Sequence, residues 1–78
     1  MDLKSDQVLD ARGLSCPMPM LRTKKALKGI AAGQVLEVWG TDPGSKNDIS
    51  DFCRKNGNEL LSMTDVPEGY TRYLIKKQ

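Results

Sequence analysis

The sequence contains no histidine, and this absence excludes more chemistry than any other feature of its composition. Without histidine there is no Cys-His or Ser-His pair that could activate a nucleophile. The two cysteines are too few for a disulfide-stabilised scaffold or for a zinc site made of cysteine alone. We therefore expect neither a metal site nor a cofactor. Any chemistry must use a nucleophile that activates itself, and cysteine is the strongest candidate.

Long hydrophobic segments are also missing. The longest runs, such as Ile30–Ala32 and Tyr73–Ile75, are far shorter than the roughly 20 residues that a bilayer-spanning helix needs. The N-terminal segment Met1–Asp6 has no hydrophobic stretch of the kind that directs secretion. We therefore expect no membrane association and a location in the reducing cytoplasm, where disulfide frameworks are rare.

Aromatic residues and excess charge are scarce as well. Aromatic residues make up 5% of the chain, and the net charge of +2 is too small to indicate nucleic-acid binding by itself. The rest of the composition, 38% hydrophobic and 28% charged over 78 residues, fits one small globular domain that spans residues 1–78. A chain of this size buries only about 60% of its unfolded surface, so its core is thin.

Hydrophobic periodicity and turn signals predict four strands and two helices. The strands are expected at 8–11, 34–39, 59–63 and 70–76, and the helices at 17–30 and from about 45 to 56. The order β-α-β-α-β-β makes the first two strands parallel, with a right-handed helical crossover, and the last two an antiparallel hairpin. The predicted fold is therefore α+β: a two-layer α/β sandwich in which two helices cover one face of a mixed four-stranded sheet.

The sequence allows two different starting residues for the second helix. Ser45 followed by Asp48 resembles a capping box, whereas Asp42 could instead cap a helix that begins at Pro43. Asn56-Gly57 provides the left-handed stop at its other end.

Cys16 lies between the first predicted strand and the first predicted helix. Pro17 lacks an N–H and has a preset φ, so it suits the first helical position and leaves Cys16 as the N-cap. Pro19 has no N–H to donate, which leaves those of Met18 and Met20. A thiolate here meets the positive end of the helix dipole, which lowers the thiol pKa. Lowering that pKa from about 8.5 to about 7 raises the thiolate fraction at pH 7 from about 3% to about half.

The second cysteine has the opposite character. Cys53 lies beside Phe52 on the apolar stripe of the second predicted helix, and cysteine is among the residue types most often buried. We expect it to be an inert part of the core. Two alternatives for Cys16 stay open: it could be an incidental cysteine, or it could form a redox pair with Cys53, although the C-x-x-C spacing typical of such pairs is absent.

The residues around Cys16 resemble a known signature. The run from Leu9 to Pro19 (Leu-Asp-Ala-Arg-Gly-Leu-Ser-Cys-Pro-Met-Pro) is similar to the Cys-Pro-x-Pro segment of the TusA family of sulfur carrier proteins, which includes SirA-like proteins. The resemblance covers nearly the whole chain, with a domain core at about 8–77. Further matching elements are Thr41-Asp42-Pro43, Asp48-Ile49, Phe52-Cys53 and Arg72-Tyr73-Leu74-Ile75.

This resemblance implies a fold like the C-terminal domain of translation initiation factor three. It also implies that Cys16 carries sulfane sulfur as a persulfide, received from a cysteine desulfurase or a rhodanese. The sulfur would pass to a downstream sulfur-relay protein, for tRNA thiolation or another sulfur-trafficking pathway. Pro17 and Pro19 belong to the motif that starts the helix, and Met18 stands where members of the tRNA-thiolating branch often have glutamate. We expect the free protein to be a monomer.

A basic face on the first predicted helix is the candidate docking surface for these partners. It consists of Arg22, Lys24, Lys25 and Lys28, and Met18 adjoins it next to the thiol. Loops that follow parallel strands meet at one edge of a sheet, so Asp42 and Lys46 are further candidate neighbours of the thiol. The plainer alternatives are a solvated helix surface and, for Asp42, a turn residue.

A different function remains in competition: a noncatalytic RNA- or protein-binding module that uses the same basic face. The fold type is shared with RNA-contacting domains, but this analogy is weak support. The aromatic residues argue against direct nucleic-acid binding because they fall in predicted strands or core stripes rather than among the lysines. These residues are Trp39, Phe52, Tyr70 and Tyr73. We therefore favour the sulfur carrier.

Overall fold

The computed structural model describes residues 5–15 and 17–78, so Cys16 lies outside the described residues. Its elements in chain order are β1 (Gln7–Ala11), α1 (Met18–Lys28), β2 (Val35–Gly40), α2 (Ser45–Asn56), β3 (Glu59–Asp65) and β4 (Thr71–Lys76). Every predicted element is present, with ends that lie within a residue or two of the prediction. Within the described part of the chain, no helix has the length and hydrophobicity to cross a membrane.

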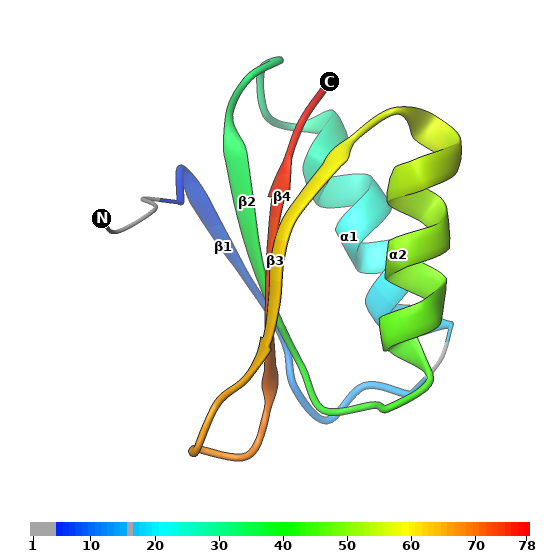
Figure 1. The fold of residues 1–78 in the computed structure, drawn as a ribbon, viewed down its shortest axis with the longest axis vertical. Helices are drawn as coiled ribbons and strands as arrows, with labels where there is room; N and C mark the ends of the chain where they lie inside the picture. Colours follow the sequence, from blue (N-terminus) through cyan, green and yellow to red (C-terminus); the bar gives the residue numbers. More distant parts are fainter. Residues whose placement is uncertain (1–4, 16) are drawn as a thin grey trace.

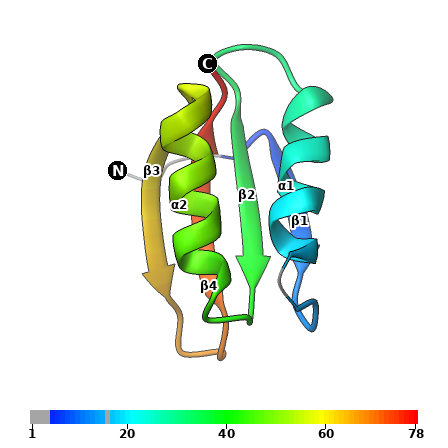
Figure 2. The ribbon, with the colours of Figure 1, turned by 90° about the vertical axis from the view of Figure 1, so that its right-hand side faces the viewer.

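The strands form one mixed sheet in the order β1-β2-β4-β3. β1 pairs with β2 in parallel, and β4 is antiparallel to both β2 and β3. The pairing of β3 with β4 shifts register between Leu60 and Ser62, which marks a β-bulge. Both helices lie on one face of the sheet (Figure 1), where α1 contacts β1 and β2 while α2 contacts β3 (Figure 2). The predicted two-layer α+β fold is confirmed.

The core lies between the sheet and the helices and follows from alternation along the central strands. Leu36 and Val38 of β2 are buried on the helix-facing side, directly opposite Ile75 and Tyr73 of β4. The helices contribute Leu27, Ile49 and Cys53 to the same cluster. Removing a side chain of this size from water stabilises the fold by about 1.5–3 kcal/mol, so these few residues supply most of the driving force.

The apolar side of α1 faces the sheet. Thr23 and Leu27 are buried, and so is Ile30, which follows the helix. The Thr23 hydroxyl donates to the Pro19 carbonyl at 2.7 Å. This bond allows a polar side chain to lie in the core without the penalty of an unpaired hydroxyl.

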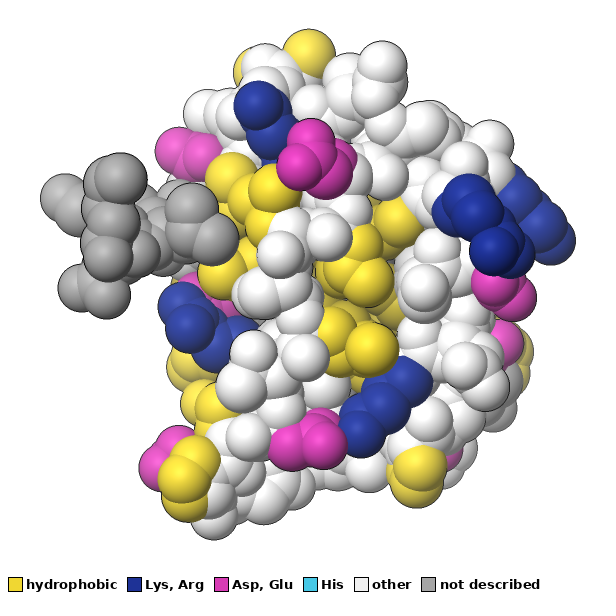
Figure 3. Space-filling model, in the orientation of Figure 1, with side chains coloured by type: hydrophobic (Ala, Val, Ile, Leu, Met, Phe, Trp, Pro, Cys, Tyr) yellow, Lys and Arg dark blue, Asp and Glu magenta, His cyan; other side chains and the backbone are white. Residues whose placement is uncertain are grey.

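The core reaches the surface beside β3. Phe52 of α2 and Leu60 of β3 are only partly buried where they pack against it. Hydrophobic side chains gather in the middle of this face, and charged side chains lie around its margin (Figure 3). A two-layer domain of this size does not have enough chain to cover both of its open sides.

The predicted start of α1 is wrong by one residue. Pro17, and not Cys16, is the N-cap, and Met18 is the first helical residue. The Met18 N–H donates to the Ser15 carbonyl at 2.8 Å, which closes a turn before the helix. The Leu21 N–H then donates to the Pro17 carbonyl at 3.0 Å. Pro19 falls in the first helical turn, where a missing N–H costs no helical hydrogen bond.

The start of α2 corrects both predictions. Ser45 does not form a capping box, because its hydroxyl donates to the Asp42 carboxylate at 3.3 Å instead of accepting from the helix. Asp42 also accepts the Gly44 N–H at 3.3 Å, and Gly44 is the N-cap. Neither predicted cap is the N-cap: Gly44 lies one residue before Ser45 and two residues after Asp42, and the first helical residue is Ser45 rather than Pro43. At the other end, Gly57 has the predicted left-handed conformation, with φ of 75°.

Cys53 is buried, as predicted. Only 2% of it is exposed, and burial raises the pKa of its thiol to about 11. A thiol in this environment stays protonated at neutral pH and is a poor nucleophile.

We expect Cys53→Ser to lower the free energy of unfolding by about 1–3 kcal/mol, because it places a hydroxyl in an apolar site. Urea denaturation measures this change. Asn47→Ser on the exposed side of the same helix is the control and should change stability by less than about 0.5 kcal/mol. A Cys53→Ser protein as stable as wild type would contradict the burial of this side chain.

Candidate functional site

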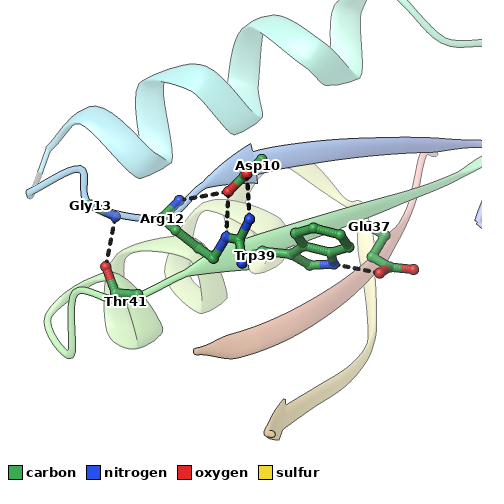
Figure 4. A network of polar contacts seen from close by, with 6 residues as sticks. All are labelled: Asp10, Arg12, Gly13, Glu37, Trp39 and Thr41. Atoms are coloured by element: carbon green, nitrogen blue, oxygen red, sulfur yellow. Dashed lines mark hydrogen bonds and ion pairs between the residues drawn. The ribbon is translucent and has the colours of Figure 1, made fainter. Parts of the chain in front are cut away.

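Two loops meet at the carboxyl edge of the parallel strand pair. The loop of residues 12–17 connects β1 to α1, and that of residues 41–44 connects β2 to α2 (Figure 2). The Gly13 N–H donates to the Thr41 hydroxyl at 2.9 Å and joins them (Figure 4). Gly13 has φ of 81°, a left-handed conformation that glycine adopts without strain. The expectation that both loops share one edge is confirmed.

The predicted catalytic residue, Cys16, lies outside the described residues. The described residues on either side of it, Ser15 and Pro17, are both exposed. The described positions on either side of Cys16 are thus open to solvent, and Pro17 is the N-cap of α1.

The outer side of α1 carries hydrophobic and basic residues together. Met18 and Leu21 are 38% and 45% exposed at the start of the helix. The basic residues are Arg22, Lys24, Lys25 and Lys28, all of them exposed. Met18, Leu21 and Lys25 lie three or four positions apart, so they share one side of the helix. The sequence analysis did not identify Leu21. Its signal in the sequence is an apolar residue on the side of the helix that faces away from the core.

Lys24 lies toward the other helix. It lines a groove between α1 and α2 together with Phe52 and Asn56. The basic face predicted from the sequence therefore wraps from the outer side of α1 into the seam between the helices.

The two remaining candidates near the thiol have structural contacts of their own. Asp42 caps the turn that leads into α2, as described above. Lys46 forms an ion pair with Asp65 at the end of β3, at 2.9 Å, and the Thr71 hydroxyl donates to the same carboxylate at 2.8 Å. The Lys46 ammonium lowers the pKa of Asp65, and the bond from Thr71 adds to this effect. Lys46 thus ties α2 to the β3–β4 hairpin.

A polar and aromatic network covers part of the outer sheet face, opposite the helices. Asp10 and Arg12 alternate along the chain and so project to the same side, and Asp10 lies opposite Trp39 in the sheet. The Arg12 guanidinium contacts the ring of Trp39 (Figure 4). It also contacts the ring of Tyr70. The sequence analysis missed this network. The Asp-x-Arg alternation was a signal for the ion pair, but nothing local pointed to the rings.

Glu37 anchors the other end of this network. Although it is only 8% exposed, its carboxylate accepts hydrogen bonds from Trp39, from Arg72 at 3.1 Å and from Ser5 at 3.1 Å. The Arg72 guanidinium holds the pKa of Glu37 below its ordinary value against the opposing effect of burial. The carboxylate is therefore charged and fixes the indole of Trp39.

The described residues contain no group of three or more Cys, Asp or Glu side chains placed to hold a metal ion. What the described residues offer chemically is a pair of exposed positions, Ser15 and Pro17, on either side of the cysteine, a helix N-terminus and a basic, partly apolar helix face.

Known proteins similar to this chain decide its family. The family described as Sulfurtransferase TusA matches residues 7–77. The chain belongs to the TusA family. YrkI of Bacillus subtilis (strain 168) is 54% identical over 63 residues, which are 81% of this chain and 84% of that protein. The sulfur carrier protein TusA of Allochromatium vinosum is 50% identical over 72 residues, which are 92% and 93% of the two chains.

A solved structure supports the fold of this TusA-family chain. The crystal structure of a SirA-like protein from Desulfitobacterium hafniense superimposes with a TM-score of 0.81 at 27% sequence identity. The match covers 90% of this chain and 95% of the other. The resemblance noted from the Cys-Pro-x-Pro segment is therefore confirmed at the level of family and fold.

The Asp10–Arg12 pair leads to a prediction about pH. Hydrogen bonds from the Arg12 side chain, and then from its backbone N–H, lower the pKa of Asp10 from 3.8 to about 2. Because the pKa is lowered in the folded protein, the pair stabilises the fold above pH 3.8 and loses this contribution as the pH falls toward 2. We expect NMR titration of the Asp10 carboxyl carbon to show this value, and Arg12→Ala to return it toward 3.8.

Arg54→Ala is the control for this titration, because Arg54 pairs with Asp51 on α2 and does not contact Asp10. A wild-type Asp10 that titrates at its ordinary value would show that the pair is not formed in solution.

Proposed function

We propose that this protein is a sulfur carrier that accepts sulfane sulfur as a persulfide on Cys16 and relays it to a downstream acceptor. The observation that carries the proposal is the position of Cys16. It stands in the Cys-Pro-x-Pro segment of a TusA-family chain, between exposed neighbours and next to the N-terminus of α1. Membership of a family that includes a protein named as a sulfur carrier supports the same role.

The proposed transfer is a thiol exchange in two steps. The Cys16 thiolate attacks the outer sulfur of the donor persulfide, R–S–SH. A new S–S bond forms to Cys16 while the S–S bond of the donor breaks, and the donor leaves as the thiolate R–S⁻ with the electron pair of that bond. Cys16 then carries –S–SH, and an acceptor thiolate attacks its outer sulfur in the same way. No net oxidation occurs, and the rate depends on thiolate fraction and leaving-group pKa.

This chemistry suits a chain without histidine. The attacking group needs only to be ionised, and the helix N-terminus favours a negative charge beside it. Because Pro17 rather than Cys16 is the N-cap, Cys16 is one residue farther along the chain from the first helical turn, and its activation by the helix N-terminus stays a prediction.

We infer that the donor is a cysteine desulfurase or a rhodanese and that it docks on α1. Basic side chains there would attract an acidic partner surface, and exposed Met18 and Leu21 would add apolar contact close to the thiol. The acceptor would be a sulfur-relay protein for tRNA thiolation or another sulfur-trafficking pathway. The reducing cytoplasm fits this role, because a free thiol persists there.

The competing RNA-binding function has less support. Base stacking would require aromatic rings among the basic residues. Trp39 and Tyr70 instead lie on the outer face of the sheet, whereas α1 lies on the opposite face (Figure 1).

We expect Cys16→Ser to abolish persulfide loading when the protein is incubated with a cysteine desulfurase and cysteine, because a hydroxyl replaces the attacking thiol and the remaining thiol, Cys53, is buried. Mass spectrometry detects loading as an added sulfur mass. Stability should change by less than about 0.5 kcal/mol, because the described positions 15 and 17 on either side are exposed. Cys53→Ser is the matched control and should load normally. Loading that survives in Cys16→Ser would overturn the assignment.

We expect the double charge reversal Lys24→Glu/Lys25→Glu to weaken binding of the desulfurase by at least about tenfold at low salt, and by less at high salt, where the attraction is already screened. Calorimetric titration measures both affinities. The alkylation pKa of Cys16 should rise only slightly, since exposed charges act on it through solvent.

The matched control is Arg54→Glu/Lys76→Glu, which carries the same change of net charge on exposed positions away from α1. An affinity that is unchanged and insensitive to salt in the Lys24/Lys25 variant would make the basic face of α1 an ordinary solvated surface.

A further inference from the structure

Arg12 belongs to the Cys-Pro-x-Pro segment, yet the proposed transfer gives it no role. It directly follows β1 and opens the loop of residues 12–17 that contains Cys16. Its side chain lies along the outer face of the sheet beside Trp39, away from α1 (Figure 4). An arginine held in this way can act on the loop only through the backbone.

Asp10 holds both the backbone and the side chain of Arg12. Its carboxylate accepts the Arg12 backbone N–H at 3.1 Å, Nε–H at 2.9 Å and Nη2–H at 2.8 Å. The two side-chain bonds fix the plane of the guanidinium. Lysine offers no such planar pair of donors, so it cannot replace arginine in this geometry.

Two aromatic rings pack against the Arg12 guanidinium. Its central carbon lies 5.0 Å from the ring centre of Trp39 and 5.4 Å from that of Tyr70. The two rings are 5.3 Å apart and inclined at 37°. Trp39 is itself held by its bond to Glu37. We call Asp10, Arg12, Trp39 and Tyr70 the Arg12 clamp; it joins β1, β2 and the segment before β4.

The two residues after Arg12 are also held by contacts with the rest of the protein. Gly13 donates to the Thr41 hydroxyl at 2.9 Å. The Leu14 N–H donates to the Ala11 carbonyl at 3.3 Å, and its side chain packs against the core. Three consecutive residues, from Arg12 to Leu14, therefore have defined contacts, and Ser15 and Cys16 follow directly.

The stability that the Asp10–Arg12 ion pair adds to the fold does not account for the number of contacts that hold Arg12. The side chains of Arg12 and Asp10 are 46% and 49% exposed, and ion pairs with this exposure add little to the free energy of folding. The geometry of a reaction is much more sensitive, since a misplacement of about 1 Å can cost about 100-fold in rate.

We propose that Arg12 is a positioning residue for sulfur transfer. The clamp sets the course of residues 12–14, and through them it would set the direction in which the Cys16 sulfur is presented to the outer sulfur of a donor persulfide. This inference rests on the proposed function, in which Cys16 is the sulfur acceptor.

The test compares Arg12→Lys and Asp10→Ala with wild type in single-turnover loading by a cysteine desulfurase, measured by mass spectrometry over a range of donor concentrations. Asp10→Ala removes the three bonds but keeps the charge of Arg12. Both variants should lower the saturating loading rate by at least about tenfold and leave the half-saturating donor concentration unchanged. Alkylation of Cys16 by iodoacetamide should change by less than about twofold, because a small reagent can approach from many directions.

Arg54→Lys is the control, since Arg54 forms an exposed ion pair with Asp51 at the same 2.8 Å and lies far along the chain from the loop. It should load at the wild-type rate. Amide hydrogen exchange gives a direct readout of the loop: the Gly13 amide should exchange faster in both clamp variants, and at the wild-type rate in Arg54→Lys.

Several results would overturn the inference. If Arg12 touched the donor, Arg12→Lys would raise the half-saturating concentration and Asp10→Ala would load normally. If the clamp were only structural, the midpoint of urea unfolding would fall and loading and alkylation would change together. If both clamp variants loaded at the wild-type rate while Cys16→Ser did not load, the positioning role of Arg12 would be refuted and the proposed function would stand. Loading that persists in Cys16→Ser would instead refute the proposed function.

Discussion

The parallel pairing of β1 with β2 is the constraint on which the rest of the structure depends. Adjacent parallel strands need a crossover, so α1 must traverse one face of the sheet and both strands must end at the same edge. The loop with Cys16 and the loop before α2 therefore meet there, and the Gly13–Thr41 bond joins them. The same pairing sets Asp10 opposite Trp39 on the outer face. The loop and its support thus both come from one strand pairing.

The sequence was sufficient to predict the elements and their layering, because alternation along the strands and the periodicity of the helices both specify a single buried face. It was less reliable at the helix ends. Pro17 and Pro19 are both compatible with a first helical turn, so residue type alone could not place the N-cap. Before α2, Ser45 and Asp42 could each act as a cap. In the folded turn Gly44 is the N-cap and the Ser45 hydroxyl donates to the Asp42 carboxylate, and residue type alone does not specify this arrangement.

Some features of the candidate site could likewise be predicted from local sequence, and others could not. Cys16 and the basic residues of α1 could be identified from a local motif and a helical pattern, and Cys53 could be assigned to the core from its place beside Phe52. The stacking of Arg12 on Trp39 and Tyr70 could not, because it requires the register of β1 against β2 and the path of the chain before β4. Contacts between residues distant in sequence that depend on register are beyond what a single-sequence pattern encodes.

The β-bulge in β3 affects how readily the edge of the sheet could pair with a strand of another molecule. An open sheet of four strands has two free borders, and each could recruit a strand from another molecule. Here one border is the short strand β1 with charged Asp10, and the other is β3, which is bulged between Leu60 and Ser62 and has Glu59 and Asp65 at its ends. Irregular and charged borders discourage the addition of a strand from another molecule, so the open sheet does not invite polymerisation into fibrils.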